Sequence, residues 1–211
     1  TTKSGEGLLN CGTHVIDACR YLMGDPGTEW VMAAVERKTD RYERDVRIED
    51  CCMGLIQFKG GAQALVQSDL TPEHWSVDEY QVRGTEGVLE TNAQTVRYVN
   101  DDSDGWVTVD LPTEDPWVLQ ARATVDWFEG GKGHRGEARQ ARHAVDIMMA
   151  MYQSARDHEV VRMPMADTGY PMDLMFEEGK IPVMESGAYD IRSFLAMEPE
   201  DRKRYSDMRR Q

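Results

Sequence analysis

The region from Trp30 to Pro112 consists of short apolar runs separated by turn-forming residues, and this pattern constrains the fold more than any other feature. Gly, Asn and Asp separate runs of Val, Ile, Leu, Tyr and Trp at roughly even spacing, which is typical of strands joined by tight turns. Because such short connections can join only antiparallel neighbours, we expect a largely antiparallel sheet. The predicted strands are residues 30–37, 50–59, 62–70, 79–84, 87–91, 95–100 and 106–111.

Three segments with apolar residues at helical spacing flank the predicted sheet. They are residues 8–23, residues 116–128 and residues 136–158, and a short strand is expected at 160–163. The second helix begins at Asp115-Pro116, an N-cap residue followed by proline at the first helical position. Its apolar stripe is formed by Val118, Ala121, Val125 and Phe128. The sequence therefore predicts an α+β fold in which helices pack on one face of an open sheet.

The predicted domain spans residues 1–165, and residues 166–211 form an irregular extension that ends in a charged helix. The extension is rich in proline and weakly periodic, so we expect it to pack as an arm over its own domain or a neighbour. In the sheet, the segments 62–67 and 95–99 suggest a second face that is neither fully polar nor fully apolar. We expect a partner subunit to cover that face in a homo-oligomer.

Charge and composition exclude several classes of function. The 24 Lys and Arg residues against 38 Asp and Glu residues give a net charge of −14, which disfavours a nucleic-acid surface. No apolar run approaches the roughly 18 residues that a membrane span needs, so we expect no membrane association. Cysteines 11, 19, 51 and 52 show no C-x-x-C spacing and are predicted to be reduced residues of a cytoplasmic protein.

The first predicted helix carries the strongest site candidate. Asn10, His14, Asp17 and Tyr21 follow one another at intervals of four, three and four residues, so their side chains share one stripe. Histidine titrates near neutral pH, and a polar neighbour one turn away can orient it as an acid or base toward a hydroxyl group. The alternative is a histidine at a helix start that hydrogen-bonds Asn10 or Asp17 and has no chemical role.

A glycine-rich segment, residues 131–136, matches the letters G-x-G-x-x-G but follows a predicted helix. Dinucleotide binding by this motif needs a strand before the turn, so we do not assign it to a cofactor. His134 and Arg135 in this loop suit a polyol or an anion, unless the loop is only a linker. Trp75 is either an aromatic platform for a sugar or a core or interface residue.

Metal binding and nucleophilic catalysis have weaker support. His14 with Asp17, or His134 with His143, provides two ligands without a visible third, so no metal site is predicted. No G-x-S-x-G motif is present.

Residues 5–17, Gly-Glu-Gly-Leu-Leu-Asn-Cys-Gly-Thr-His-Val-Ile-Asp, followed by Arg-Tyr-Leu-Met-Gly at 20–24, resemble a known family. They are similar to the start of the C-terminal domain of the glucose-fructose oxidoreductase and inositol dehydrogenase (Gfo/Idh/MocA) family. Similar segments follow at 49–62, 82–87 and 152–164, so the resemblance covers about residues 4 to 165. His14 in its glycine context is its most specific element.

In that family an N-terminal Rossmann domain holds NAD or NADP, and the C-terminal domain supplies the substrate pocket and an open sheet used for oligomerisation. The resemblance implies the substrate-binding and oligomerisation domain of an NAD(P)-dependent oxidoreductase acting on a sugar, cyclitol or related polyol. His14 and Asn10 are then the catalytic candidates, and Asp17, Trp75, His134 and Arg135 are substrate-binding candidates. Asn10 stands where many members carry aspartate. An amide cannot relay a proton, so we expect Asn10 to orient the substrate.

The sequence contains neither a glycine fingerprint after a strand nor the E-K-P-type lysine segment of the family. We therefore expect no NAD(P) binding and no turnover by this chain alone. It is expected to be either a fragment of a longer enzyme or a stand-alone domain. One alternative is a non-catalytic domain that binds carbohydrate or serves as a scaffold. Another is a relative that uses tightly held NAD for elimination or glycoside cleavage; retained NAD would distinguish it from a plain dehydrogenase.

Overall fold

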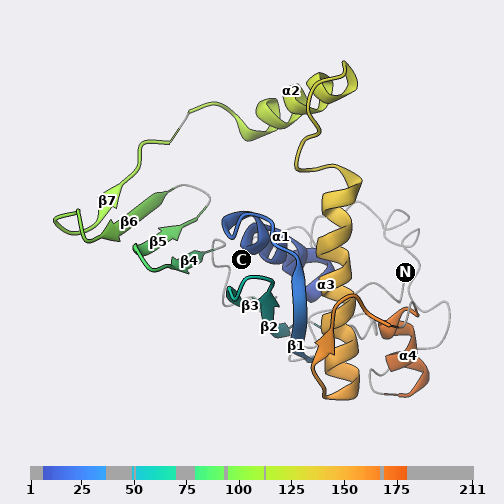
Figure 1. The fold of residues 1–211 in the computed structure, drawn as a ribbon. Coiled ribbons are helices and arrows are strands. Elements are labelled where there is room, and N and C mark those ends of the chain that lie inside the picture. The colour runs from blue at the N-terminus through green and yellow to red at the C-terminus, as the bar shows by residue number, and fades with distance from the viewer. Residues whose placement is uncertain are drawn as a thin grey trace, which may run out of the picture.

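The computed structural model describes residues 7–36, 49, 51–69, 79–92, 95–111, 113–166 and 169–179. Helices and strands follow one another as Figure 1 shows. The helical elements are the π-helix η1 (Gly7–Gly12) and the α-helices α1 (Thr13–Leu22), α2 (Pro116–Phe128), α3 (Ala138–Asp157) and α4 (Pro171–Glu177). The strands are β1 (Thr28–Glu36), β2 (Cys51–Phe58), β3 (Gln63–Asp69), β4 (Tyr80–Arg83), β5 (Gly87–Thr91), β6 (Val96–Asn100), β7 (Val107–Thr108) and β8 (Val161–Arg162).

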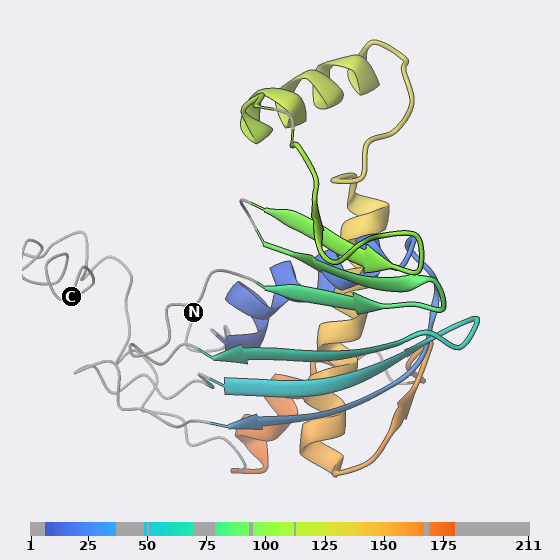
Figure 2. The same cartoon turned by 90° about the vertical axis from the view of Figure 1, so that its left-hand side faces the viewer.

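The strands form two antiparallel sheets of four strands each. Their orders are β3-β2-β1-β8 and β4-β5-β6-β7, and every pairing between neighbours is antiparallel. Figure 2 shows the two sheets one beside the other, with β4 next to β3. The predicted α+β class and antiparallel pairing are confirmed. The strands divide into two hydrogen-bonded sheets, however, where the sequence suggested one.

The main core lies between α3 and the first sheet. On α3, Ile147, Met151 and Tyr152 are almost completely buried, and they pack in the same core as Val31 and Ile56. The alternation expected of a strand is present in β1, where Val31 is buried and Met32 is 49% exposed. One face of this sheet is therefore covered by a helix, and the described residues leave Met32 on the other face half exposed.

Helix α2 differs from the expectation that all helices pack on the sheet. It begins as predicted, since the Asp115 side chain accepts a hydrogen bond of 2.8 Å from the Trp117 N–H and Pro116 occupies the first turn. None of its residues is buried, however, and Figures 1 and 2 show it standing away from the sheets. The predicted core stripe is exposed, with Val125 at 54% and Phe128 at 77%. The Asp115 cap acts over a few residues and fixes where α2 begins, whereas burial of the apolar stripe requires another element to pack against it.

The segment after β8 begins with a packed helix. Met175 of α4 is 4% exposed and belongs to the same core as α3, so the start of the predicted extension packs on its own domain. The charged helix expected near the end of the chain lies outside the described residues, and the boundary at residue 165 stays a prediction. Among the described helices, none is both long and apolar enough to cross a membrane.

Candidate functional site

The predicted site stripe lies on the outer face of η1 and α1. Asn10 and His14 are exposed, Tyr21 is 62% exposed, and the side chain of Asp17 is 39% exposed. On the opposite side of α1, Ile16 is completely buried. The amphipathic pattern of the helix therefore leaves the polar side chains accessible to a ligand.

The π-helix that precedes α1 is held by buried polar groups. The carboxylate Oε1 of Glu49 accepts hydrogen bonds from the Leu8 N–H at 3.0 Å and from the Tyr152 hydroxyl at 2.5 Å. The Glu49 carbonyl accepts from the Gly7 N–H at 3.2 Å, and the Ser68 hydroxyl donates to the Gly7 carbonyl at 2.8 Å. These bonds fix the first residues of η1, Gly7 and Leu8.

Burial determines the ionisation of the tyrosine in this arrangement. Tyr152 is fully buried. Burial, and then the adjacent negative charge of Glu49, raise the pKa of Tyr152 far above its ordinary value. Its hydroxyl therefore stays protonated and remains a donor to the carboxylate.

Two of the predicted site residues, Asp17 and Arg135, meet in the structure. The Arg135 guanidinium bonds the Asp17 carboxylate through Nη1 and the Asp17 carbonyl through Nη2, the latter at 2.9 Å. It also bonds both carboxylate oxygens of Asp25, at 3.2 Å from Nε and 2.7 Å from Nη2. The Cζ atom of Arg135 lies 5.2 Å from the centroid of the Tyr21 ring. The glycine loop thus contacts the predicted stripe.

A second arginine, Arg20, completes what we call the four-charge cluster: Arg20, Arg135, Asp17 and Asp25. Arg20 is 2% exposed, and its nitrogens lie 3.5 Å from Asp17 Oδ1 and 3.5 Å from Asp25 Oδ1. It also donates to the carbonyl and the side-chain oxygen of Gln140, at 3.1 and 3.2 Å. The cluster therefore connects α1 with the first turn of α3.

The two arginines of the cluster respond differently to their surroundings. Burial lowers the pKa of Arg20 below its ordinary value, although Asp25 and Asp17 act against this change. For Arg135, burial also acts to lower the pKa, but the hydrogen bonds with Asp17 and Asp25 outweigh it and raise the pKa overall. Both side chains remain cationic at neutral pH, because arginine titrates far above that range.

The remaining predicted site residues lie elsewhere. The ring of His134 packs edge-on against Trp127 at the end of α2, with centroids 5.3 Å apart, and its Nδ1 accepts from the Gly136 N–H at 3.1 Å. Trp75 lies outside the described residues. The described part of the chain holds no group of three His, Cys, Asp or Glu side chains suited to a metal ion.

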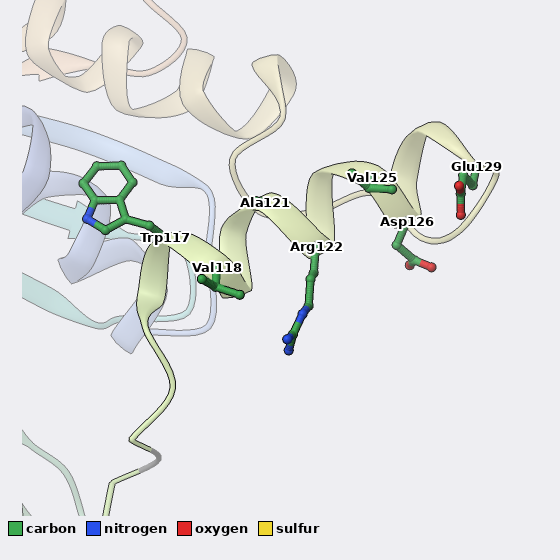
Figure 3. A pocket seen from close by; sticks show the side chains of 7 residues that line it. All are labelled: Trp117, Val118, Ala121, Arg122, Val125, Asp126 and Glu129. Carbon is green, nitrogen blue, oxygen red and sulfur yellow. The ribbon is translucent and has the colours of Figure 1, made fainter.

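An open, mainly apolar hollow runs along one side of α2 and is shown in Figure 3. Its residues all belong to α2 or its C-cap: Trp117, Val118, Ala121, Arg122, Val125, Asp126 and Glu129. None of the residues of the predicted stripe lines this hollow.

Sequence reasoning missed Arg20, Asp25, Glu49 and Tyr152. Only Arg20 had a local signal, because it follows Asp17 by three residues on one helix and can pair with it. The bond between Tyr152 and Glu49 joins residues 103 positions apart, and no spacing rule reveals such a contact.

Comparison with known protein families finds one model that matches part of this chain. Residues 1–90 match the model of the GFO/IDH/MocA C-terminal domain. The sequence has no match among curated proteins.

Solved structures share the fold at low sequence identity. The aldose-aldose oxidoreductase from Caulobacter crescentus, solved with glycerol, is 20% identical with a TM-score of 0.64 and covers 75% of this chain and 48% of its own. A levoglucosan dehydrogenase with NADH and levoglucosan is 21% identical with a TM-score of 0.66, covering 76% and 50%. An NAD binding oxidoreductase from Klebsiella pneumoniae is 17% identical with a TM-score of 0.66, covering 76% and 52%.

The chain spans about half the length of these structures, with 48% to 52% of each covered. The shared fold extends over 75% or 76% of this chain. The resemblance inferred from the sequence is therefore confirmed, because residues 1–90 match the model of the GFO/IDH/MocA C-terminal domain.

Proposed function

We propose that this chain is the substrate-binding and oligomerisation domain of an NAD(P)-dependent oxidoreductase that acts on a sugar, cyclitol or related polyol. The observation that carries the proposal is the exposure of His14 on α1, within the stretch that matches the family model. Two solved structures with the same fold are complexes with levoglucosan and with glycerol, which are polyhydroxy compounds.

His14 is the proposed acid or base for a substrate hydroxyl. A neutral imidazole nitrogen can accept the hydroxyl proton, and the exposed position leaves the ring open to a ligand. Asn10 is exposed on the preceding turn and offers both a donor and an acceptor, so it can orient the substrate without taking up a proton. Trp75 and His134 stay predictions as substrate contacts.

NAD(P) does not fit the glycine loop of this chain. The loop of residues 131–136 lies between two helices, α2 and α3, so no strand leads into it. A dinucleotide site of the fingerprint type needs a strand, a tight turn and a helix N-terminus in that order. In this proposal, the cofactor is held by a part of the enzyme other than the residues described here.

The open face of the first sheet is the proposed oligomer interface. Met32 on β1, Leu55 on β2 and Leu65 on β3 are paired in register and form one apolar row across the three strands. Met32 is 49% exposed and Leu65 is 73% exposed. Because exposed apolar rows of this kind mark protein interfaces, we propose that a second copy of the chain packs on this row.

The catalytic part of the proposal is tested by His14→Ala in the full-length enzyme. We expect kcat for polyol oxidation to fall by about 10²- to 10⁴-fold, the usual contribution of a general acid or base. His143→Ala, at an exposed histidine on α3, is the matched control. Unchanged kinetics of His14→Ala in a folded enzyme would refute the assignment.

The oligomerisation part is tested by Leu65→Glu, with molar mass measured by light scattering after size exclusion. We expect a smaller assembly, because the new charge would be buried in the interface. Val145→Glu is the control, since Val145 is 45% exposed on α3 rather than on the sheet. The interface is wrongly placed if both variants keep the parental mass.

The alternative is a non-catalytic carbohydrate-binding or scaffold domain, and Asn10 favours it because an amide replaces the carboxylate that many relatives carry. Native mass spectrometry of the purified protein distinguishes the two. Bound NAD(P) in a polypeptide longer than 211 residues supports the oxidoreductase, and a nucleotide-free chain of 211 residues supports the alternative.

A further inference from the structure

The loop between α2 and α3 is attached to α1 through Arg135. This side chain makes four hydrogen bonds, two to the Asp25 carboxylate, one to the Asp17 carboxylate and one to the Asp17 carbonyl. A guanidinium has five N–H donors. At most one donor of Arg135 is therefore left for a ligand.

The four-charge cluster is electrically balanced, with two arginines and two aspartates. Arg20 faces the Asp17 oxygen Oδ1, while Arg135 bonds the other oxygen, Oδ2. Both oxygens of the Asp17 carboxylate are thus directed at arginines. Asp17 follows His14 by three residues on the same helix, so these bonds fix a side chain one turn away from the proposed acid or base.

The cluster also joins two regions of the chain that are distant in sequence, residues 17–25 and residues 135–140. Asp17 belongs to α1, and Asp25 to the turn that follows it. Arg135 precedes α3, and Arg20 donates to Gln140 in the first turn of α3. These ion pairs and hydrogen bonds therefore link α1 and the turn after it to the start of α3.

Arg135 also lies close to the exposed ring of Tyr21, at 5.2 Å from its centroid. A cation at this distance from an aromatic face is attracted to it. Tyr21 and Asp17 are both on the predicted stripe, so one arginine restrains two of its side chains.

We propose that Arg135 is a positioning residue for the site on α1: it holds Asp17 and Tyr21 in one arrangement beside His14 rather than binding substrate. The sequence alone left this loop as a polyol or anion binder or as a linker. The inference rests on the proposed function, because it assigns Arg135 a part in presenting the same site.

The first test is hydrogen exchange of the full chain with Arg135→Gln, which requires no activity. We expect at least tenfold faster amide exchange in residues 131–137 than in the parent. Arg142→Gln is the matched control, because Arg142 is 79% exposed and pairs with Asp146 on its own helix, α3. Unchanged exchange in the loop of Arg135→Gln would overturn the proposal.

The second test is kinetic and uses the full-length enzyme with a polyol substrate. Arg135→Gln should lower kcat/KM about tenfold, and Arg135→Lys should recover part of it, because lysine keeps the charge but loses the two-pronged geometry. Asp25→Asn should have a similar effect, although Asp25 lies in the turn after α1 rather than on its stripe.

The double variant Arg135→Gln with Asp25→Asn separates positioning from substrate contact. If the two residues act through one cluster, the double variant should be little worse than either single variant. Additive losses, or normal kinetics in Asp25→Asn, would show that Arg135 acts independently of Asp25 and would overturn the proposal. Faster loop exchange with unchanged kcat/KM would also overturn it, because the role would then be structural only.

His14→Gln in the same assay separates this inference from the proposed function. If His14→Gln keeps full activity, the proposed function fails, whatever the exchange data show. If His14→Gln loses activity and the Arg135 variants do not, only the positioning role fails.

Discussion

The bond between Tyr152 and Glu49 offers a sharp test of how the site helix is supported. Tyr152 is fully buried, Glu49 is 2% exposed, and the hydroxyl lies 2.5 Å from the carboxylate oxygen. Tyr152→Phe keeps the ring and removes only the donor. Hydrogen bonds to charged groups contribute roughly 1.5–3 kcal/mol to stability. We therefore expect the free energy of unfolding to fall by about this amount.

The corresponding change in melting temperature is measurable. One kcal/mol shifts Tm by about 2–4 °C in a domain of this size, so Tyr152→Phe should lower Tm by roughly 3–12 °C. Circular dichroism melts at neutral pH measure this shift. Tyr21→Phe is the matched control, because Tyr21 is 62% exposed and a surface change of this kind stays within about 0.5 kcal/mol.

The same oxygen of Glu49 also accepts a hydrogen bond from the Leu8 N–H at 3.0 Å, so removing the Tyr152 hydroxyl should also destabilise η1. We expect faster amide exchange at residues 8–12 in Tyr152→Phe than in Tyr21→Phe. Tm reports the free energy of unfolding when the transition is two-state. If Tyr152→Phe then melts within 1 °C of Tyr21→Phe, the hydrogen bond contributes nothing to stability and the reasoning is refuted.

Three further predictions concern packing, thiols and charge. Gly54→Ala should lower stability by about 1–3 kcal/mol, because a Cβ there would overlap Met151 Cε in the core. An unchanged urea midpoint would show that Met151 moves aside at no cost. Burial raises the pKa of Cys19 to about 11 and that of Cys52 to about 12. Because the thiolate is the reactive form, neither thiol should react with a disulfide reagent at pH 8 before the protein unfolds. Rapid labelling of native Cys52 would contradict this prediction. These folded-state pKa values lie above the ordinary thiol pKa of 9.0. The stability gained by burying the two neutral thiols is therefore complete below pH 9 and declines as the pH rises through 11 and 12. Measuring the free energy of unfolding across this alkaline range tests the decline. The net charge of −14 predicts a higher Tm when ionic strength rises from about 0.01 to about 0.1 M, where the screening length falls from about 30 to about 10 Å; a lower Tm would show that attractive ion pairs dominate.

Local patterns predicted the secondary structure well. The expected strand at 87–91 coincides with β5, and the expected helix at 116–128 coincides with α2. Turn glycines, the Asp115 cap and Pro116 act over a few residues, and their effect on the backbone does not depend on the rest of the fold. The first helix was predicted at 8–23, but its opening turn is the π-helix η1, which buried Glu49 and Ser68 hold in place.

The sequence also placed Asn10, His14, Asp17 and Tyr21 on one stripe, because helical spacing alone decides which side chains share a face. It named Asp17 and Arg135 as candidates without indicating that they bond to each other across 118 positions. Only the tertiary structure decided that contact, the burial of Arg20, and the exposure of α2. Each depends on which surfaces meet after the chain has folded, and residues distant in sequence approach one another for reasons that no local spacing records.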